Sequence, residues 1–281
     1  MSVQDGTVFA GGLQFHVRDW GGQGQPPLLM LHGLASTVHM FDLIAPALTD
    51  RFHVIAFDQR GHGLSDKPDE GYDFETIAQD VDHVVQVLKL DGTPLTLLGH
   101  SWGAYTTSYY AATRPDALKK AALIDGGLRS LQSIFPTWAE AEIGMALPRY
   151  ANMTVDAIRR LIREDWLGAV YRPELEPLAL SVFDLSDEYD VHPHLSREHH
   201  MQIARQVWAF NPADFYGRIQ CPVLIVNAVG SSHAADPDII QPTEAAQQRI
   251  PAAEVVWMED TVHDIPWHRP AELVAILKCF L

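Results

Sequence analysis

The chain has 281 residues, 47% of them hydrophobic, and its 36 acidic residues outnumber its 20 basic residues to give a formal net charge of −16. This length allows one large domain or two small ones with a substantial core. The acidic balance argues against nucleic acid and anionic membrane surfaces as partners, which leaves a small molecule as the expected one.

The N-terminal segment lacks a basic stretch followed by an apolar one, and no window approaches the roughly 20 apolar residues of a spanning helix. Cys221 and Cys279 show no metal-site spacing. We expect both to be buried thiols in a reducing compartment. The sequence therefore predicts a soluble, cytoplasmic protein.

Short apolar runs alternate with longer helical patterns along most of the chain. The expected strands are residues 13–17, which alternate like an edge strand, and then 28–31, 54–57, 95–98, 121–124, 223–226 and 255–258. The expected helices are residues 74–88, 104–113, 243–249 and 271–281. This order predicts an α/β fold with a mostly parallel central sheet and helices on both faces.

The alternation breaks once, between residues 128 and 211, where helical patterning, several prolines and many aromatic residues replace the strand signals. Structureless loops of such length are uncommon in compact domains. We therefore predict a core domain of residues 1–127 and 213–281 with a strand-free helical cap of residues 128–212. Some of its aromatic side chains should face the ligand site, because the insertion leaves from the carboxyl end of a strand.

A serine stands between the predicted strand 95–98 and the predicted helix 104–113, where residues 99–103 read Gly-His-Ser-Trp-Gly. So sharp a turn requires a backbone conformation that L-residues avoid, and it closes only if the residues two before and two after the serine lack bulk. The hydroxyl of Ser101 then projects above the sheet, and the next amide lies at a helix start, where it can meet negative charge. The pattern predicts a serine hydrolase.

A serine nucleophile needs a base, and the base needs an acid to orient it. His263 follows the last predicted strand and precedes the terminal helix, so it lies on a loop at the carboxyl edge of the sheet. This position favours His263 as the base and preserves the chain order serine, acid, histidine. His268 is the nearest rival, but we expect it to pack or to point to solvent.

Two aspartates could serve as the acid. Asp125 ends the predicted strand 121–124, whereas Asp236 lies on the loop after the predicted strand 223–226. Either loop could reach the far nitrogen of His263. We favour Asp125, because the loop after residue 226 has no acid close to its strand.

Acyl transfer also needs two donors for the oxyanion. The amide of Trp102 is one candidate. The amide of Leu34 is the other, because Gly33 after the predicted strand 28–31 lets the backbone turn that N–H inward. We expect His32 to brace this loop.

Four histidines crowd the inserted region at positions 192, 194, 199 and 200, but no acidic or cysteine partner completes a metal-ligand spacing. The glycine-rich stretch 21–24 has no lysine to hold phosphate and reads as a turn. We therefore expect neither a metal nor another cofactor.

Three stretches of the chain together resemble the α/β-hydrolase fold family. They are residues 32–34 (His-Gly-Leu), 58–65 (Asp-Gln-Arg-Gly-His-Gly-Leu-Ser) and 99–103, and the resemblance runs from about residue 9 to residue 281. It implies Ser101 as nucleophile, His263 as base, and Leu34 and Trp102 as oxyanion donors. Most family members carry the acid after the strand matching residues 223–226, but some carry it one strand earlier, which fits Asp125. In the family the stretch 58–65 is a structural loop, so Asp58 and His62 are not expected to be catalytic.

The serine at position 101 sets the chain apart from the haloalkane dehalogenases and epoxide hydrolases of that family, which carry aspartate there. We expect hydrolysis of carboxylic esters of small to medium, largely apolar substrates through an acyl-serine. Lactonase, amidase, iminopeptidase and carbon–carbon hydrolase activities are alternatives. A cofactor-free dioxygenase would use the histidine–aspartate pair without acylating the serine, and a ligand receptor could be built on the same scaffold.

Overall fold

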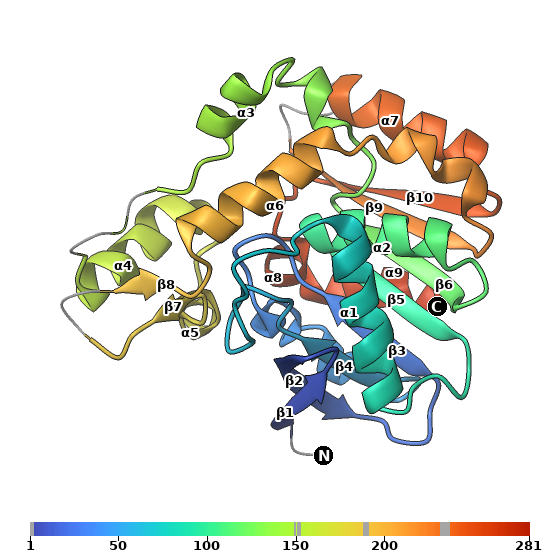
Figure 1. The fold of residues 1–281 in the computed structure, drawn as a ribbon, viewed down its shortest axis with the longest axis horizontal. Coiled ribbons are helices and arrows are strands. Elements are labelled where there is room, and N and C mark those ends of the chain that lie inside the picture. Colours follow the sequence, from blue (N-terminus) through green and yellow to red (C-terminus); the bar gives the residue numbers. More distant parts are fainter. Residues whose placement is uncertain (1–2, 149, 151–152, 188–190, 231–236) are drawn as a thin grey trace.

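One eight-stranded sheet forms the centre of the computed structural model, which describes residues 3–148, 150, 153–187, 191–230 and 237–281 (Figure 1). In spatial order the strands are β1 (Gln4–Ala10), β2 (Leu13–Gly21), β4 (His53–Phe57), β3 (Pro27–Leu31), β5 (Leu95–His100), β6 (Leu118–Ile124), β9 (Val223–Val229) and β10 (Ala253–Glu259). β2 pairs antiparallel with β1 and β4, and all other neighbours are parallel. The predicted α/β fold with a mostly parallel sheet is confirmed.

The edge of the sheet lies one strand further out than predicted. Residues 13–17 belong to β2, and β1 pairs outside it along its whole length. β1 is exposed at most of its positions, so it lacks the alternation of apolar residues that marks a half-buried strand. Its pairing depends on the backbone of β2, which a search for periodicity does not detect.

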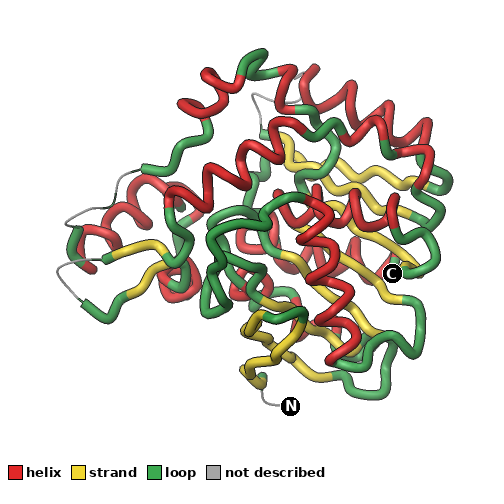
Figure 2. The backbone as a smooth tube through the Cα atoms, viewed as in Figure 1, coloured by secondary structure: helices red, strands yellow, loops and turns green. Residues whose placement is uncertain are grey.

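Helices cover both faces of the sheet (Figures 1 and 2). The helices outside the insertion are α1 (Phe74–Val87), α2 (Trp102–Thr113), α7 (Pro237–Arg249), α8 (Ile265–His268) and α9 (Pro270–Phe280). Alternate residues of β3 enter two different apolar clusters: Leu29 packs with side chains of α1 and α2, and Leu28 packs with side chains of α9. None of the described helices is both long enough and apolar enough to cross a membrane.

The inserted segment, residues 128–212, contains α3 (Trp138–Gly144), α4 (Val155–Leu161), α5 (Glu176–Leu180) and α6 (Arg197–Ala209). It is not strand-free, because β7 (Phe183–Asp184) pairs with β8 (His192–Pro193) in a two-stranded ribbon. Two residues per strand are too few to produce a periodic signal. In Figure 1, α4, α5 and the ribbon form one end of the molecule, and α6 extends from them toward α7. The boundaries of a separate cap at residues 128 and 212 stay a prediction.

Short helical turns connect these elements. They are η1 (Val38–Phe41), η2 (Ala45–Leu48), η3 (Leu131–Ser133), η4 (Ile162–Trp166), η5 (Gly168–Val170), η6 (Pro173–Leu175), η7 (Pro212–Asp214) and η8 (Tyr216–Arg218). Apolar side chains of α4 and α5 pack in one cluster with side chains of η1, and those of α6 pack against Trp102 and Tyr105 of α2. The inserted segment is therefore seated over the start of α2.

The two cysteines differ in burial. Cys221 is buried as predicted, but Cys279 is exposed, which contradicts the prediction for it. Helix α9 buries Leu273, Leu277 and Phe280, and Cys279 lies on the adjacent outward face. Cys279 and Phe280 are adjacent in the sequence but differ in burial, because only one stripe of the helix surface faces the core.

A buried carboxylate ties the loop after β4 to β2 and η1. Asp58 is 2% exposed and accepts hydrogen bonds from His16 Nδ1 at 2.8 Å, the Val38 amide at 2.8 Å and the Leu64 amide at 3.0 Å. Burial opposes its ionisation, but the bond from His16 and the backbone donors outweigh burial and hold the pKa of Asp58 at about 2. Asp58 is a structural centre, as the resemblance implies.

Candidate active site

The turn that carries Ser101 has the strained geometry expected from the sequence. Ser101 lies between β5 and α2 with φ of 54° and ψ of −117°, a conformation that L-residues rarely adopt. A Cβ at Gly99 would lie 2.1 Å from the Gly103 carbonyl oxygen, and one at Gly103 would lie 2.1 Å from the Leu31 carbonyl oxygen. The turn therefore excludes any side chain at either glycine.

The structure brings Ser101, His263 and Asp125 together in a chain of hydrogen bonds. His263 Nε2 lies 2.9 Å from Ser101 Oγ, and His263 Nδ1 lies 2.5 Å from Asp125 Oδ2. The other oxygen of Asp125 accepts the Ala228 amide at 2.8 Å, which fixes the carboxylate at the end of β9. With Nδ1–H donated to Asp125, Nε2 is left as the acceptor of the serine proton.

The surroundings of His263 favour its protonated form. Burial among protein atoms opposes protonation, but the hydrogen bond and charge of Asp125, with a contribution from Asp264, raise the pKa of His263 above 6.5, whereas Arg129 acts in the opposite direction. The side chain is nevertheless 55% accessible, because it faces an open cavity. An imidazole in this setting can take a proton from Ser101 and hold it.

The loop of residues 32–35 lies directly against the serine. A Cβ at Gly33 would come within 3.0 Å of Ser101 Cβ and 3.5 Å of Ser101 Oγ, so a glycine is needed for this approach. Within the described chain, no backbone hydrogen bond occupies the amides of Leu34 and Trp102, and both residues line a cavity with Ser101. Neither amide is committed to a described backbone partner, so both remain candidates to bind an incoming oxygen.

Two buried histidines fix this loop. His32 Nδ1 donates to the Gly33 carbonyl at 2.8 Å and Nε2 accepts the Gln59 amide at 3.0 Å, so His32 braces the loop as predicted. His62 is not expected to be catalytic, and its Nε2 accepts the Ala35 amide at 3.2 Å. Ala35 has a φ of 56°, so this bond holds a strained turn directly after Leu34.

His62 also touches the second oxyanion candidate. Its ring stacks on Trp102 with the centroids 5.2 Å apart, and its Nδ1 donates to the Arg60 carbonyl at 3.0 Å. Burial, followed by the nearby charge of His32, lowers the pKa of His62 well below 6.5, so it remains a neutral acceptor. No local pattern in residues 58–65 marks this role, because it depends on contacts across three loops.

Two cavities meet at the serine and share Leu34, Ser101 and His263. The first has a volume of about 490 Å³ and a largely apolar wall. From the inserted segment it is lined by Tyr150, Leu161, Trp166, Val182 and Phe183, among others. The second has a volume of about 300 Å³ and is lined by Asp125 and Arg129, among others.

The described residues among the remaining sequence candidates have other partners. Asp236, the alternative acid, falls outside the described residues. His268 belongs to α8, and its Nδ1 accepts the Val262 amide at 3.3 Å. On α6, His200 Nε2 donates to the Met145 carbonyl at 2.8 Å, and the ring of His199 packs on Tyr72.

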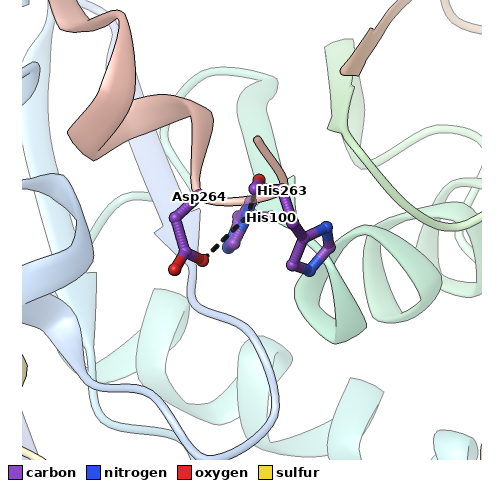
Figure 3. A group of neighbouring side chains, drawn as sticks. All are labelled: His100, His263 and Asp264. Carbon is purple, nitrogen blue, oxygen red and sulfur yellow. Dashed lines mark hydrogen bonds and ion pairs between the residues drawn. The ribbon is translucent and has the colours of Figure 1, made fainter. Parts of the chain in front are cut away.

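Within the part of the chain that the structure describes, one group of side chains has atoms close enough to share a cation: His100, His263 and Asp264 (Figure 3). Their ligand atoms lie within 4.8 Å of one another. His100 Nε2, however, donates to the His263 carbonyl at 3.0 Å, and both ring nitrogens of His263 are engaged by Asp125 and Ser101. In Figure 3 the ring of His263 points away from Asp264. We therefore assign these three residues to the hydrogen-bonded site and not to a cation site.

Comparison with known proteins agrees with the fold. Residues 26–270 match the family model described as alpha/beta hydrolase fold. The chain belongs to the alpha/beta hydrolase family. This hydrolase is 35% identical over 191 residues to 2-(acetamidomethylene)succinate hydrolase of Mesorhizobium japonicum, a match that covers 62% of this chain and 65% of the relative. It is 34% identical over 116 residues to a human serine hydrolase-like protein, covering 41% of this chain and 56% of the relative.

The hydrolase also matches a solved structure over almost its whole length. The crystal structure of E-2-(acetamidomethylene)succinate hydrolase superposes with a TM-score of 0.81 at 23% identity and covers 99% of each chain. At this identity the superposition shows the fold. The sequence matches to the two curated relatives span less than two thirds of the length of each.

Proposed function

We propose that this hydrolase cleaves a carboxylic ester of a small molecule through an acyl intermediate on Ser101, with His263 as base and Asp125 as the orienting acid. The observation that carries the proposal is the continuous chain from Ser101 Oγ through the His263 ring to Asp125, at 2.9 and 2.5 Å. These spacings are those of a nucleophile within reach of its base and a base held by its acid.

In the proposed reaction, Ser101 Oγ attacks the ester carbonyl carbon as His263 Nε2 takes the hydroxyl proton. The carbonyl oxygen becomes negative and accepts hydrogen bonds from the amides of Leu34 and Trp102. The carbon–oxygen bond to the alcohol then breaks, and His263 returns the proton to the leaving oxygen. A water molecule repeats the sequence on the acyl-serine and releases the acid.

The first cavity supports a compact, largely apolar group on one side of the scissile bond. Its 490 Å³ lies within the size range of small-molecule sites, and its wall combines apolar side chains of the core with those of the inserted segment. The Mesorhizobium relative is named for an acetamido compound. An amide is therefore the second candidate for the scissile bond, and the same residues would attack it.

The first test is hydrolysis of p-nitrophenyl esters and p-nitroanilides of graded acyl length by wild type and Ser101→Ala. We expect ester turnover that falls by about 10⁴-fold or more in the variant, because serine, base and acid act as a unit. Ser108→Ala is the matched control, since Ser108 lies on the same helix away from both cavities.

A fluorophosphonate should add one label to wild type and none to Ser101→Ala, as read by intact mass. Turnover of p-nitroanilides at a rate above that of the esters would favour the amide candidate. Retention of ester turnover in Ser101→Ala would contradict the acyl-enzyme.

A further inference from the structure

The second cavity contains a cation that the proposed reaction does not use. Arg129 lines this cavity of about 300 Å³, as do Leu34, Ser101 and His263. It follows the turn that carries Asp125, and its carbonyl accepts the Tyr105 hydroxyl at 2.7 Å. The backbone of Arg129 is thus anchored to α2 beside the nucleophile.

The guanidinium of Arg129 has no hydrogen-bond or ion-pair partner among the described residues, although the side chain is partly buried. Other partly or fully buried arginines are paired: Arg60 with Asp80 at 2.5 Å, Arg18 with Asp42 at 2.8 Å and Arg114 with Glu75 at 2.8 Å. In a chain with a net charge of −16, a cavity arginine that pairs with none of the described residues is an exception that calls for an anionic partner.

The acids of this cavity do not supply that partner. One carboxylate oxygen of Asp125 accepts a hydrogen bond from His263, and the other accepts one from the Ala228 amide. Asp238 lines the cavity and takes part in an interaction of its own. The charge of Arg129 does reach the reacting residues, because it opposes protonation of His263. An anion bound there would lie within the substrate site.

We propose that Arg129 binds a carboxylate of the substrate, carried on the group that occupies the second cavity, while the apolar group on the other side of the scissile bond occupies the first. A guanidinium matches a carboxylate with two parallel N–H donors. This inference rests on the proposed function and narrows its substrate class to carboxylate-bearing esters or amides.

The test compares two esters that differ in one charge: p-nitrophenyl hydrogen glutarate, with a free carboxylate, and its methyl-capped counterpart, p-nitrophenyl methyl glutarate. The readout is the ratio of their kcat/KM values. We expect Arg129→Gln to lower this ratio by about 10- to 100-fold, the loss of a charge-assisted hydrogen bond. Arg129→Lys should keep part of the preference, since it keeps the charge and loses the two parallel donors.

The matched control is Arg51→Gln, which removes the same charge just before β4, at the opposite edge of the sheet from Ser101. It should leave the ratio unchanged. A ratio that Arg129→Gln does not change, or that Arg51→Gln changes equally, overturns the proposal. Ester turnover that survives Ser101→Ala would instead overturn the proposed function, so the two failures are distinguishable.

Binding to the Ser101→Ala protein tests the same inference without turnover. By calorimetry, monomethyl glutarate should bind at least about 10-fold tighter than dimethyl glutarate, and the additional change Arg129→Gln should remove the difference. Equal affinity for the two compounds, or a difference that persists without Arg129, overturns the proposal even if no ester is hydrolysed.

Discussion

The carboxyl edge of the sheet and the inserted segment are built by different physical constraints. At the edge, backbone lies against backbone, so that a Cβ at Gly103 would meet the Leu31 carbonyl oxygen at 2.1 Å. In the inserted segment, short helices begin at polar caps such as Thr137 and Thr154 and are held by apolar side chains. The edge fixes the reacting atoms, whereas the segment supplies one wall of a cavity. Substitutions in the two regions should therefore fail in different ways.

The largest effect is expected at the turn of the nucleophile. In Gly103→Ala the new methyl group overlaps the backbone of β3, so the strands or the turn must move. We expect a loss of about 3 kcal/mol or more of unfolding free energy, together with loss of turnover. Urea denaturation measures the change in unfolding free energy. Gly217→Ala is the control, because nothing lies within 4 Å of a Cβ there; equal stability of both variants would contradict the close packing.

Next in size is Asp125→Asn. The amide keeps the shape of the side chain but no longer stabilises the imidazolium or selects the tautomer with a proton on Nδ1. We expect kcat to fall by about 10⁴-fold with the fold intact, as circular dichroism would show. Asp264→Asn, which changes a carboxylate near His100 but outside the chain to Ser101, should cost far less. Comparable losses in the two variants would remove Asp125 from its proposed role.

His62→Phe should produce an intermediate effect. Phenylalanine can keep the stacking on Trp102 but cannot accept the Ala35 amide, so the strained turn after Leu34 loses its hydrogen bond. A misaimed oxyanion donor lowers kcat by about 10- to 100-fold with little change in KM, because the oxyanion forms only in the transition state. Steady-state kinetics separate the two parameters. A change in KM alone would show that His62 shapes the cavity only.

A smaller effect is expected in the inserted segment. Trp166 is 37% exposed, lines the first cavity and packs at 5.9 Å from Trp267. Trp166→Ala should enlarge the first cavity and shift the preference toward esters with a larger apolar alcohol group, with changes in kcat/KM of about 10-fold or less. Ile143→Ala, at a side chain that is 82% exposed, is the control. A loss of kcat as large as that of Asp125→Asn would contradict the division between the two regions.

The smallest effect is a shift in pH dependence. Asp125, Asp264, Arg129 and His100 surround His263, and His100 stays neutral because burial, followed by the charge of His263, lowers its pKa to about 4. Activity needs neutral His263, so the acid limb of kcat/KM for a neutral ester should lie above pH 6.5. Arg129→Gln removes a positive charge that opposes protonation of His263, so the acid limb of the pH profile should move to higher pH by less than about one pH unit. Added salt should reduce this shift. An unmoved limb would place Arg129 out of electrostatic reach.

Short-range signals in the sequence predicted much of this molecule. The flanking glycines of Ser101 report a local backbone constraint, and the place of His263 after the last strand follows from sheet topology. Two aspartates stand on suitable loops, and their positions in the sequence do not decide between them; the structure places Asp125 Oδ2 2.5 Å from His263 Nδ1. The sequence could not reveal His62, because its contacts with Ala35 and Trp102 join loops distant along the chain.

The wrong predictions have physical causes that the order of side chains does not reveal. The edge strand β1 and the ribbon of β7 and β8 are held by backbone pairing, which leaves little trace in the order of side chains. The exposure of Cys279 depends on the rotation of α9 about its axis. No sequence signal marks Arg129, because an arginine on a loop usually pairs or faces solvent, and its lack of a partner among the described residues is a property of the three-dimensional structure.

The hydrogen bond between His16 and Asp58 separates the conditions for stability from those for activity. The pKa of Asp58 is held at about 2, below its ordinary value of 3.8, so its stabilising effect is present above pH 3.8 and is lost as the pH falls toward 2. The pKa of His16 is raised above 6.5, although burial opposes this, so its contribution is complete below pH 6.5 and is lost as the pH rises through the raised value. This pair therefore stabilises the fold most in mildly acidic solution, where His263 is largely protonated and the proposed base is inactive. A buffer chosen for turnover therefore has a pH above this mildly acidic range, whereas a storage buffer chosen to preserve this ion pair has a pH within it.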